Sequence, residues 1–303
     1  APFDHFVVSS PAYVPLFIED NCSIIPPAID PLSHKNRTLD LHKCIGILHQ
    51  SGVINGKGPI LYDFYKYQVK RIQPDGSFGK VNEPEELEII YRPTILQVSR
   101  WDRLKGFKPL LEAFVMLKEN IERPATDIHH KRLQKARLLL AGPDPDFVAD
   151  DPEGRQVLEE LIDAYRNIDK RFQADIAILL LPMNDAKQNA LIVNALQRSS
   201  SIIVQNSLQE GFGLTATEAM WKKVPIIVSN AAGLRYQVKH EENGFIVKDA
   251  SNTNLVMETL DKMLSIPKER EKWGFNGQVR VINNFTIFSQ LRKWLELYAS
   301  LHS

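Results

Sequence analysis

From Arg92 onward the sequence alternates between short apolar runs and segments whose apolar residues have helical spacing. In residues 109–119, for example, Leu110, Leu111, Phe114 and Leu117 recur at the period of a helix face. The apolar runs show no polar alternation, so both faces of each predicted strand are buried, as in a parallel sheet covered by helices. The sequence therefore predicts an α/β fold with a doubly wound, Rossmann-like sheet. The six predicted strands are residues 94–98, 137–142, 177–181, 201–205, 225–228 and 244–247, and the predicted helices between them are 109–119, 154–169, 190–198 and 215–222.

The sequence as a whole predicts that the chain is divided into four parts. Residues 1–40 hold two strand-length pieces (6–8 and 22–25), each followed by proline, which fit the edge of a second, N-terminal domain and the linker from it. Residues 41–91 are rich in glycine and polar side chains and predict an irregular insertion or a small hairpin. Residues 92–285 form the Rossmann-like domain and 286–303 a terminal helix. The start at Ala1, without Met, suggests a truncated or processed product, although removal of Met before Ala would look the same.

Composition excludes several classes of function. Lys plus Arg and Asp plus Glu both total 37, and this balance argues against a partner such as nucleic acid or an anionic membrane. Two isolated cysteines, Cys22 and Cys44, provide neither a disulfide framework nor a zinc site. The sequence has neither an apolar run long enough to span a bilayer nor a signal segment at its start, so we expect a cytoplasmic protein.

Parallel sheets bind ligands at the carboxyl ends of their strands, so the residues that follow each strand matter most. Residues 99–106, after the first strand, contain Arg100, Arg103 and Lys105. Arginine and lysine side chains in such a loop suit phosphate oxygens. The alternative is a solvated loop that happens to be basic.

The strongest signal is the segment 209–220, between the fourth strand and the next helix. Gly211 and Gly213 flank Phe212, so bare backbone can approach a ligand at the positive end of the helix. Glu210 lies in the loop, within reach of a sugar hydroxyl, and Glu218 lies in the helix, where it could hold a ribose. The alternative is a surface charge at Glu210 and an ordinary helix residue at Glu218.

Other patterns are weaker. Carboxylates cluster at 144–146 and 150–153, but the prolines among them favour turn and capping roles over metal binding. His129 and His130 are expected to face solvent. Met183 and Asn184 could line a base pocket or belong to a loop without ligand contacts. A nicotinamide-dependent dehydrogenase is disfavoured because no Gly-x-Gly-x-x-Gly follows the first strand, and no Gly-x-Ser-x-Gly nucleophile turn is present.

Together these motifs resemble the retaining glycosyltransferases of the GT-B architecture. Glu210 and Glu218, with seven residues between them, match the paired glutamates of that family, and Arg100 with Lys105 matches its diphosphate-binding pair. Residues 25–36, 151–154 and 210–221 are similar to the trehalose synthase and trehalose phosphorylase branch. The likeness covers residues 20–40 and 92–300, and it identifies the chain as the C-terminal half of such an enzyme.

The resemblance implies roles that spacing alone does not give. Arg100 and Lys105 would neutralise the diphosphate leaving group without a metal or any other cofactor, and Glu210 would lie beside the donor sugar. Backbone amides would bind the sugar and the phosphate, and Glu218 would hold the ribose. The amides in question belong to Gly211, Phe212 and Gly213 for the sugar, and to Leu214 and Thr215 for the phosphate.

The resemblance also implies the reaction. A nucleotide sugar of the UDP- or ADP-glucose type would donate glucose, with retention, to a sugar acceptor such as glucose, giving trehalose. Phosphorolysis of trehalose and a non-catalytic nucleotide-sugar-binding module are the alternatives. The sequence departs from the family in its long 41–91 segment and in the missing acceptor half, so we expect the isolated fragment to be inactive. The terminal helix would expose apolar surface or pair with another copy in a homodimer.

Overall fold

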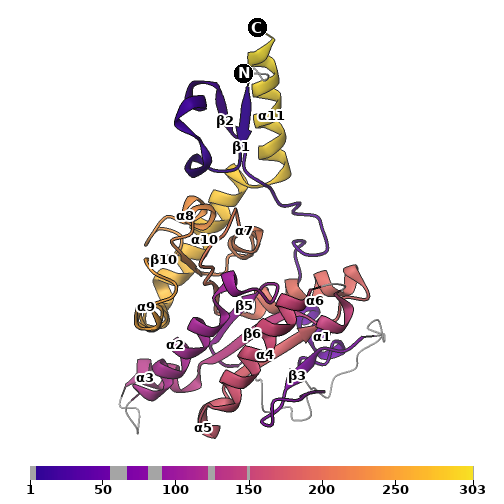
Figure 1. Cartoon of the computed structure of the whole chain (residues 1–303), viewed down its shortest axis with the longest axis vertical. Coiled ribbons are helices and arrows are strands. Elements are labelled where there is room, and N and C mark those ends of the chain that lie inside the picture. The colour runs from indigo at the N-terminus through magenta and orange to yellow at the C-terminus, as the bar shows by residue number, and fades with distance from the viewer. Residues whose placement is uncertain (1–4, 55–66, 81–90, 122–126, 149–150, 303) are drawn as a thin grey trace.

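The computed structural model describes residues 5–54, 67–80, 91–121, 127–148 and 151–302, and an eight-stranded sheet is its centre (Figure 1). Six neighbouring strands are parallel, and two short strands at one edge are antiparallel. In the order in which they lie, the strands are β10 (Phe245–Val247), β9 (Ile226–Ser229), β8 (Ile202–Gln205), β5 (Thr94–Val98), β6 (Arg137–Pro143), β7 (Ile176–Leu181), β3 (Lys70–Ile72) and β4 (Phe78–Gly79).

The order of the parallel strands indicates where a sheet of this kind binds its ligand. Numbered along the chain with β5 as the first, they lie in the order 3-2-1-4-5-6, read from β7 to β10. The direction of winding reverses between β5 and β8. In doubly wound sheets ligands bind at the carboxyl ends of the strands at this switch point. The loops that follow β5 and β8 are therefore the ones that can form a site together.

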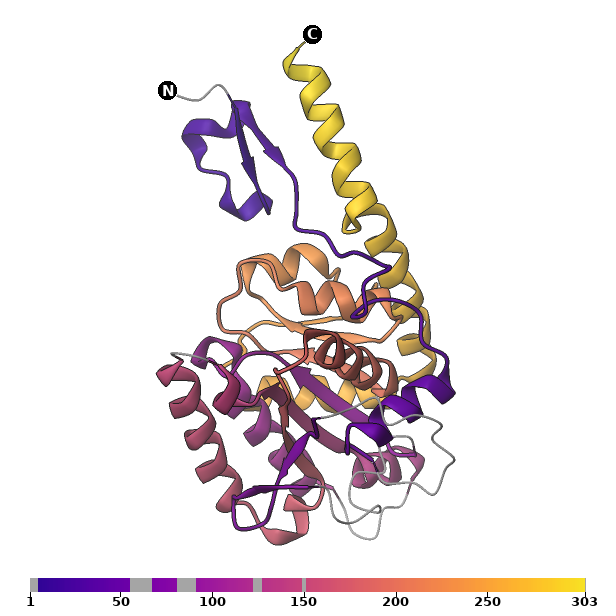
Figure 2. The same cartoon turned by 90° about the vertical axis from the view of Figure 1, so that its right-hand side faces the viewer.

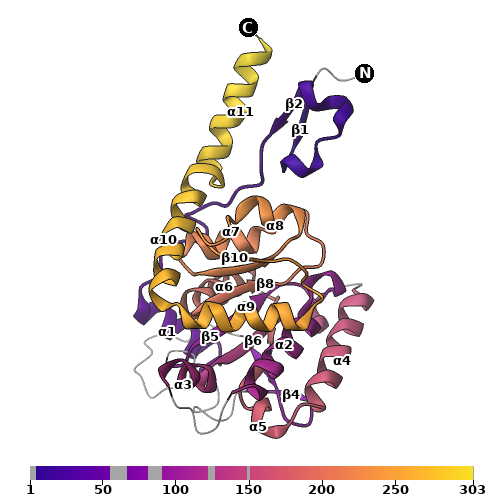
Figure 3. The same cartoon turned by 90° about the vertical axis from the view of Figure 1, so that its left-hand side faces the viewer.

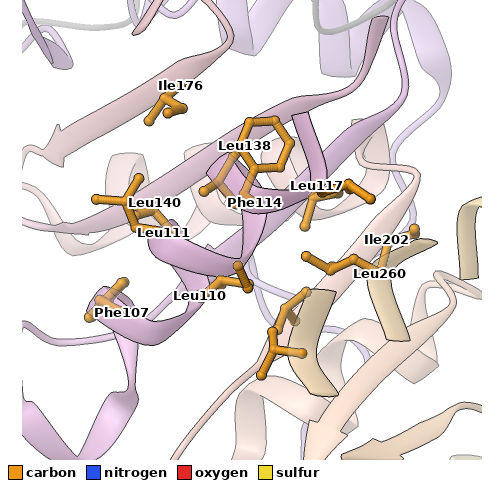
Figure 4. Close-up of a cluster of buried hydrophobic side chains, with 14 of the residues drawn as sticks. Phe107, Leu110, Leu111, Phe114, Leu117, Leu138, Leu140, Ile176, Ile202 and Leu260 are labelled. Atoms are coloured by element: carbon orange, nitrogen blue, oxygen red, sulfur yellow. The ribbon is translucent and has the colours of Figure 1, made fainter. Parts of the chain in front are cut away.

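Helices cover both faces of the sheet, with one hydrophobic cluster on each side (Figure 3). Successive residues of β6 point to opposite faces: Leu138 and Leu140 join one cluster, and Leu139 and Ala141 join the other. Figure 4 shows the first cluster, where Phe107, Phe114 and Leu260 pack over the sheet. The helices on that face are α2 (Phe107–Glu119), α3 (Ile128–Lys135), α4 (Pro152–Arg166) and α9 (Thr253–Ser265). Those that contribute to the other cluster are α1 (Leu41–Gln50), α6 (Ala186–Ser199), α7 (Leu214–Trp221), α8 (Ala232–Gln237) and α10 (Pro267–Asn284), and the short α5 (Lys170–Gln173) precedes β7.

The α/β prediction with a doubly wound parallel sheet is confirmed, and all six predicted strands are present. The 41–91 segment was expected to be an irregular insertion or a small hairpin; the structure has a hairpin there, β3–β4, and also a helix, α1, that was not expected. Residues 41–50 form helix α1, which packs against α6 through Cys44, Ile47 and Leu48. The hairpin β3–β4 extends the sheet, because β3 pairs antiparallel with β7. The division of the chain into four domains stays a prediction.

The N-terminal segment and the last helix extend away from the sheet (Figure 2). Strand β1 (Phe6–Val8) pairs in parallel with β2 (Cys22–Ile24), and α11 (Ile287–Leu301) follows a capping box at Thr286. The Gln290 amide donates a hydrogen bond of 2.8 Å to the carbonyl of Pro26. Exposed apolar side chains gather on α11, among them Phe288, Leu295 and Tyr298. Among the helices of the described ranges, none is both long enough and apolar enough to cross a membrane.

Candidate active site

The loops after β5 and β8 are joined by direct hydrogen bonds at the switch point. The amide of Leu208 donates to the carbonyl of Leu104 at 2.7 Å. The buried Gln97 side chain connects the same two loops: its Nε2 donates to the Lys105 carbonyl at 2.7 Å, and its Oε1 accepts from the Asn206 amide at 3.0 Å. The position of one loop therefore fixes that of the other.

Only glycine fits where the first loop approaches the second. Gly106 has φ of 62°, and a Cβ added there would lie 2.1 Å from the carbonyl oxygen of Asn206. Just before it, Asp102 caps the 3-10 helix Arg103–Lys105 by accepting from the Leu104 amide at 2.8 Å. Lys105 thus sits at a defined place between a capped turn and a left-handed glycine.

Lys105 and Glu210 meet across the switch point. Lys105 Nζ lies 2.6 Å from Glu210 Oε2, and the two side chains are only 17% and 14% exposed. The hydroxyl of Ser207 also donates to Glu210 Oε2, at 3.2 Å. A cation and a carboxylate that are largely withdrawn from water, at the carboxyl ends of two adjacent strands, form an electrostatic centre of the kind that active sites use.

The other two cations of the first loop behave differently. Arg103 pairs with Glu160 of α4 at 2.6 Å, so it is directed away from Glu210. Arg100 is exposed and has no hydrogen bond or ion pair within the described ranges. Of the predicted cationic pair, the structure brings Lys105 to the glutamate and leaves Arg100 free at the end of β5.

Residues 210–213, which we call the glycine turn, lead into α7. Gly213 is the N-cap of α7, with φ of 85° and no side-chain hydrogen bond to the helix amides. Because φ is positive and an added Cβ would also lie 2.6 Å from the Leu234 side chain, position 213 requires glycine. Phe212 is buried and packs edge-on against Phe285 at 5.7 Å, which anchors the turn to the core. Leu214 begins α7 and is partly exposed. The first amides of α7 are therefore available to an anion.

Donors hold every carbonyl of the glycine turn. The Tyr13 hydroxyl contacts the carbonyl oxygens of Glu210 and Gly211 at 3.1 and 2.9 Å. The Gln237 side-chain amide donates to the carbonyls of Phe212 and Gly213. The sequence did not reveal Tyr13 or Gln237 as site residues, because neither lies next to a recognised motif.

Glu218 lies in a buried polar cluster at the end of the linker. Its Oε1 is 3.2 Å from Lys35 Nζ, and its Oε2 has no hydrogen-bond partner among the described residues although the side chain is only 6% exposed. Lys222 donates to Asn36 Oδ1 at 3.1 Å and to the Glu218 carbonyl at 3.2 Å. Burial lowers the pKa of the Lys222 ammonium to about 7. One oxygen of Glu218 is thus positioned by a lysine, and the other is a buried acceptor without a hydrogen-bond partner among the described residues.

The acidic clusters have the structural roles that the sequence predicted. Asp144 accepts from the amide of Asp146, and Asp151 caps α4 by accepting from the amide of Gly154. Lys70 lies 2.8 Å from Asp144, and that hydrogen bond raises the pKa of the Lys70 ammonium. Asp150 lies outside the described residues.

The remaining candidates stand apart from the two loops. His129 and His130 are half-buried on α3 and pair with Asp261 and Asp127, which differs from the solvent-facing position expected for them. Their aromatic rings lie beside carboxylates of α9 and of the α3 N-cap, so neighbouring side chains cover them. Met183 is exposed after β7, where Asn189 donates to its sulfur at 3.3 Å.

Known proteins match both the sequence and the fold. Trehalose synthase of Pyrococcus horikoshii is 31% identical over 300 residues, which cover 99% of this chain and 58% of that protein. Trehalose phosphorylase of Pleurotus pulmonarius is 27% identical over 169 residues, or 55% of this chain and 21% of that protein. A glycosyltransferase of Rickettsia africae superposes with a TM-score of 0.66 at 21% identity, covering 99% of this chain and 64% of that one. The Anabaena protein HepE in complex with UDP and glucose gives 0.64 at 14% identity, with 98% and 63% covered.

At identities near 20% the likeness to solved structures shows the fold alone, and this fold is that of a GT-B glycosyltransferase domain. The chain spans about 58% of the length of the trehalose synthases that it matches. Residues 82–280, about two thirds of the sequence, match the family described as glycosyl transferases group 1. The chain belongs to the glycosyl transferases group 1 and is related to trehalose synthase.

Proposed function

We propose that the loops after β5 and β8 together bind the nucleoside diphosphate of a sugar donor of the UDP- or ADP-glucose type. The observation that carries the proposal is the Lys105–Glu210 pair at 2.6 Å, located beside the uncapped start of α7. A diphosphate needs fixed positive charge, which Lys105 and the α7 amides provide. A pyranose needs a hydroxyl acceptor close to its reacting carbon, which Glu210 provides.

The whole enzyme would then transfer glucose to a sugar acceptor with retention, and the preferred acceptor is glucose, which gives trehalose. Lys105 and the unpaired Arg100 would stabilise the charge that develops on the leaving diphosphate, without metal. The amides of Gly211, Phe212 and Gly213 would contact the sugar, and those of Leu214 and Thr215 the phosphate. Removal of one such preorganised donor typically costs about a hundredfold in rate.

Retention in this scheme comes from attack on the face from which the diphosphate leaves. Glu210 would hold a donor hydroxyl and support the positive charge that grows on the sugar ring. Glu218, with one oxygen on Lys35 and the other unpaired, would accept a ribose hydroxyl. The acceptor sugar would be bound by the part of the enzyme that precedes this chain. The chain alone would therefore bind the donor but transfer its glucose slowly or not at all.

Calorimetric titration with UDP, ADP, GDP and NAD tests the nucleotide site. We expect binding of at least one nucleoside diphosphate, and NAD binding without response to any diphosphate would contradict the proposal. In the whole enzyme, incubation of the nucleotide-sugar with glucose should give trehalose and the free diphosphate. Trehalose cleavage that requires inorganic phosphate would identify a phosphorylase instead, and donor binding without transfer to any sugar would identify a non-catalytic module.

A further inference from the structure

Tyr13 reaches the glycine turn from the opposite end of the sequence. Its hydroxyl lies 3.1 Å from the Glu210 carbonyl oxygen and 2.9 Å from that of Gly211, so its single proton is shared between two acceptors. The contact joins residues that are 197 and 198 positions apart in the chain. None of the motifs in the sequence accounts for it.

A short rigid turn presents Tyr13 to this place. Residues Pro11–Tyr13 form a 3-10 helix whose N-cap, the buried Ser10, accepts from the Ala12 amide at 3.4 Å. The amide of Tyr13 itself donates to the Ser10 carbonyl at 3.0 Å. Proline fixes the backbone at the first position of the turn. The same turn lies against α8, so Tyr13 approaches from a supported backbone.

The two carbonyls that Tyr13 contacts determine where the neighbouring amides point. In a planar trans peptide the C=O of one residue and the N–H of the next point in opposite directions. With the carbonyls of Glu210 and Gly211 fixed on the Tyr13 side, the amides of Gly211 and Phe212 are directed to the other side of the turn. Gln237 holds the carbonyls of Phe212 and Gly213 in the same way, which directs the amides of Gly213 and Leu214.

The turn needs such support because glycine does not hold a conformation by itself. Gly211 has no atom within 4 Å of the place where a Cβ would stand, so no side-chain packing restricts that residue. The Gly233 amide reaches the Glu210 carbonyl at 3.3 Å, but among the described residues the Gly211 carbonyl has only the Tyr13 hydroxyl as a donor. Gly233 packs against this peptide, so loss of the hydroxyl leaves the Gly211 carbonyl without a hydrogen-bond donor among the described residues and weakens the restraint on the direction of the peptide plane between Gly211 and Phe212.

We propose that Tyr13 is a positioning residue for donor binding: through the carbonyls of Glu210 and Gly211, its hydroxyl orients the backbone amides that receive the diphosphate sugar. The inference rests on the proposed function. It adds that residues 10–13, from the segment that precedes the linker, contribute to the donor site without touching the donor. A peptide group that already points toward the ligand binds a sugar oxygen better than one that must first be ordered.

The test is Tyr13→Phe in the present chain, which removes only the hydroxyl. The ligands are whichever of UDP, ADP and GDP stabilises the chain most in a thermal-shift screen, and the nucleotide glucose that carries this diphosphate. Because the amides that Tyr13 directs are those assigned to the sugar, we expect the Kd of the nucleotide glucose to rise about twofold to tenfold, the loss of one hydrogen bond, while the Kd of the free diphosphate and the melting temperature stay unchanged. Tyr298→Phe is the matched control, because its hydroxyl on α11 has no hydrogen-bond partner among the described residues.

The outcomes separate the two proposals. If the wild-type chain binds the nucleotide glucose and Tyr13→Phe binds it equally well, the positioning role is wrong and the proposed function stands. Equal losses for the nucleotide glucose and the free diphosphate, or a lower melting temperature, would show that Tyr13 only supports the fold, which also overturns the inference. If the wild-type chain binds no nucleoside diphosphate, both proposals fail.

Discussion

Replacing Lys105 by Met removes the charge at the centre of the candidate site and retains much of the side-chain volume. Two effects should follow, because Lys105 has one partner in the free protein and, as we propose, another in the complex. In the free protein it pairs with Glu210 at 2.6 Å, where both side chains are mostly buried. In the complex it would also face the diphosphate.

The structure sets the size of each effect. Without Lys105, the Glu210 carboxylate keeps, among the described residues, only the Ser207 hydroxyl at 3.2 Å, so a partly buried charge loses its main partner. A loss of this kind costs about 1–3 kcal/mol of unfolding free energy. A hydrogen bond to a charged group contributes about 1.5–3 kcal/mol, so the Kd of the diphosphate should rise roughly tenfold to a hundredfold. The monophosphate, which lacks the distal group, should lose less.

Two other cations of the same loop provide controls. Arg103→Met breaks an ion pair with Glu160 whose side chains are 50% and 43% exposed. Such surface pairs contribute about 0–1 kcal/mol, and this one faces away from Glu210, so neither stability nor affinity should change much. Arg100→Met removes a side chain that has no partner among the described residues, so it should weaken diphosphate binding and leave stability unchanged.

Urea unfolding measures the unfolding free energy of the three variants, and calorimetric titration measures their Kd for the diphosphate. Lys105→Met should lower both stability and affinity, Arg100→Met only affinity, and Arg103→Met neither. Equal affinity losses for Lys105→Met and Arg103→Met would show that overall charge, and not a specific contact, attracts the ligand. An unchanged Kd in Lys105→Met would remove the basis of the proposed diphosphate site.

Three further changes probe other parts of the structure. Gly106→Ala places a Cβ 2.1 Å from the Asn206 carbonyl in a left-handed conformation and should cost at least about 2 kcal/mol in urea unfolding, whereas Gly46→Ala in α1 meets nothing within 4 Å and should not destabilise. Because burial lowers the pKa of Lys222 to about 7, the unfolded chain binds more protons than the folded chain above that pH. The unfolding free energy should therefore rise between pH 7 and 9, by up to about 1.4 kcal/mol per pH unit. Lys222→Met should abolish this rise. In the whole enzyme, Glu210→Gln should abolish most turnover while the donor Kd changes less, and unchanged turnover would refute its assigned role.

The sheet could be predicted because its signal is local. Each buried parallel strand is a continuous apolar run, and the helices between the runs show their own period, so both patterns are visible within a few residues. Helix α1 was missed although Leu41, Cys44, Ile45 and Leu48 have helical spacing, because the glycine-rich, polar 41–91 segment was interpreted as a single unit. Strand β3 has three residues, too few for a pattern, and its pairing with β7 depends on the tertiary fold.

The site shows the same division between local and long-range information. The segments that carry Lys105 and Glu210 could be found because each follows an apolar strand, and parallel strands bring their carboxyl ends to one edge. The sequence could not show that only Lys105, of the three cations in the first loop, pairs with Glu210. Arg103 is directed elsewhere because Glu160 of α4 lies beside it, and that contact depends on the tertiary fold. The pairing of Lys35 with Glu218 joins residues that are 183 positions apart, and no spacing within either segment reveals it.

Two residues that support the site come from the N-terminal segment, where the sequence indicated no candidate site residue. Tyr13 and Lys35 both precede the sheet, yet one holds the glycine turn before α7 and the other contacts Glu218 within α7. The start and the body of the same short helix are thus attached to residues 10–13 and to the linker, respectively. A displacement of that N-terminal segment would have to change either the direction of the turn's amides or the pairing of Glu218. If the proposed function holds, donor affinity and the position of the segment are linked through α7, and by reciprocity a bound donor should hold the segment in place.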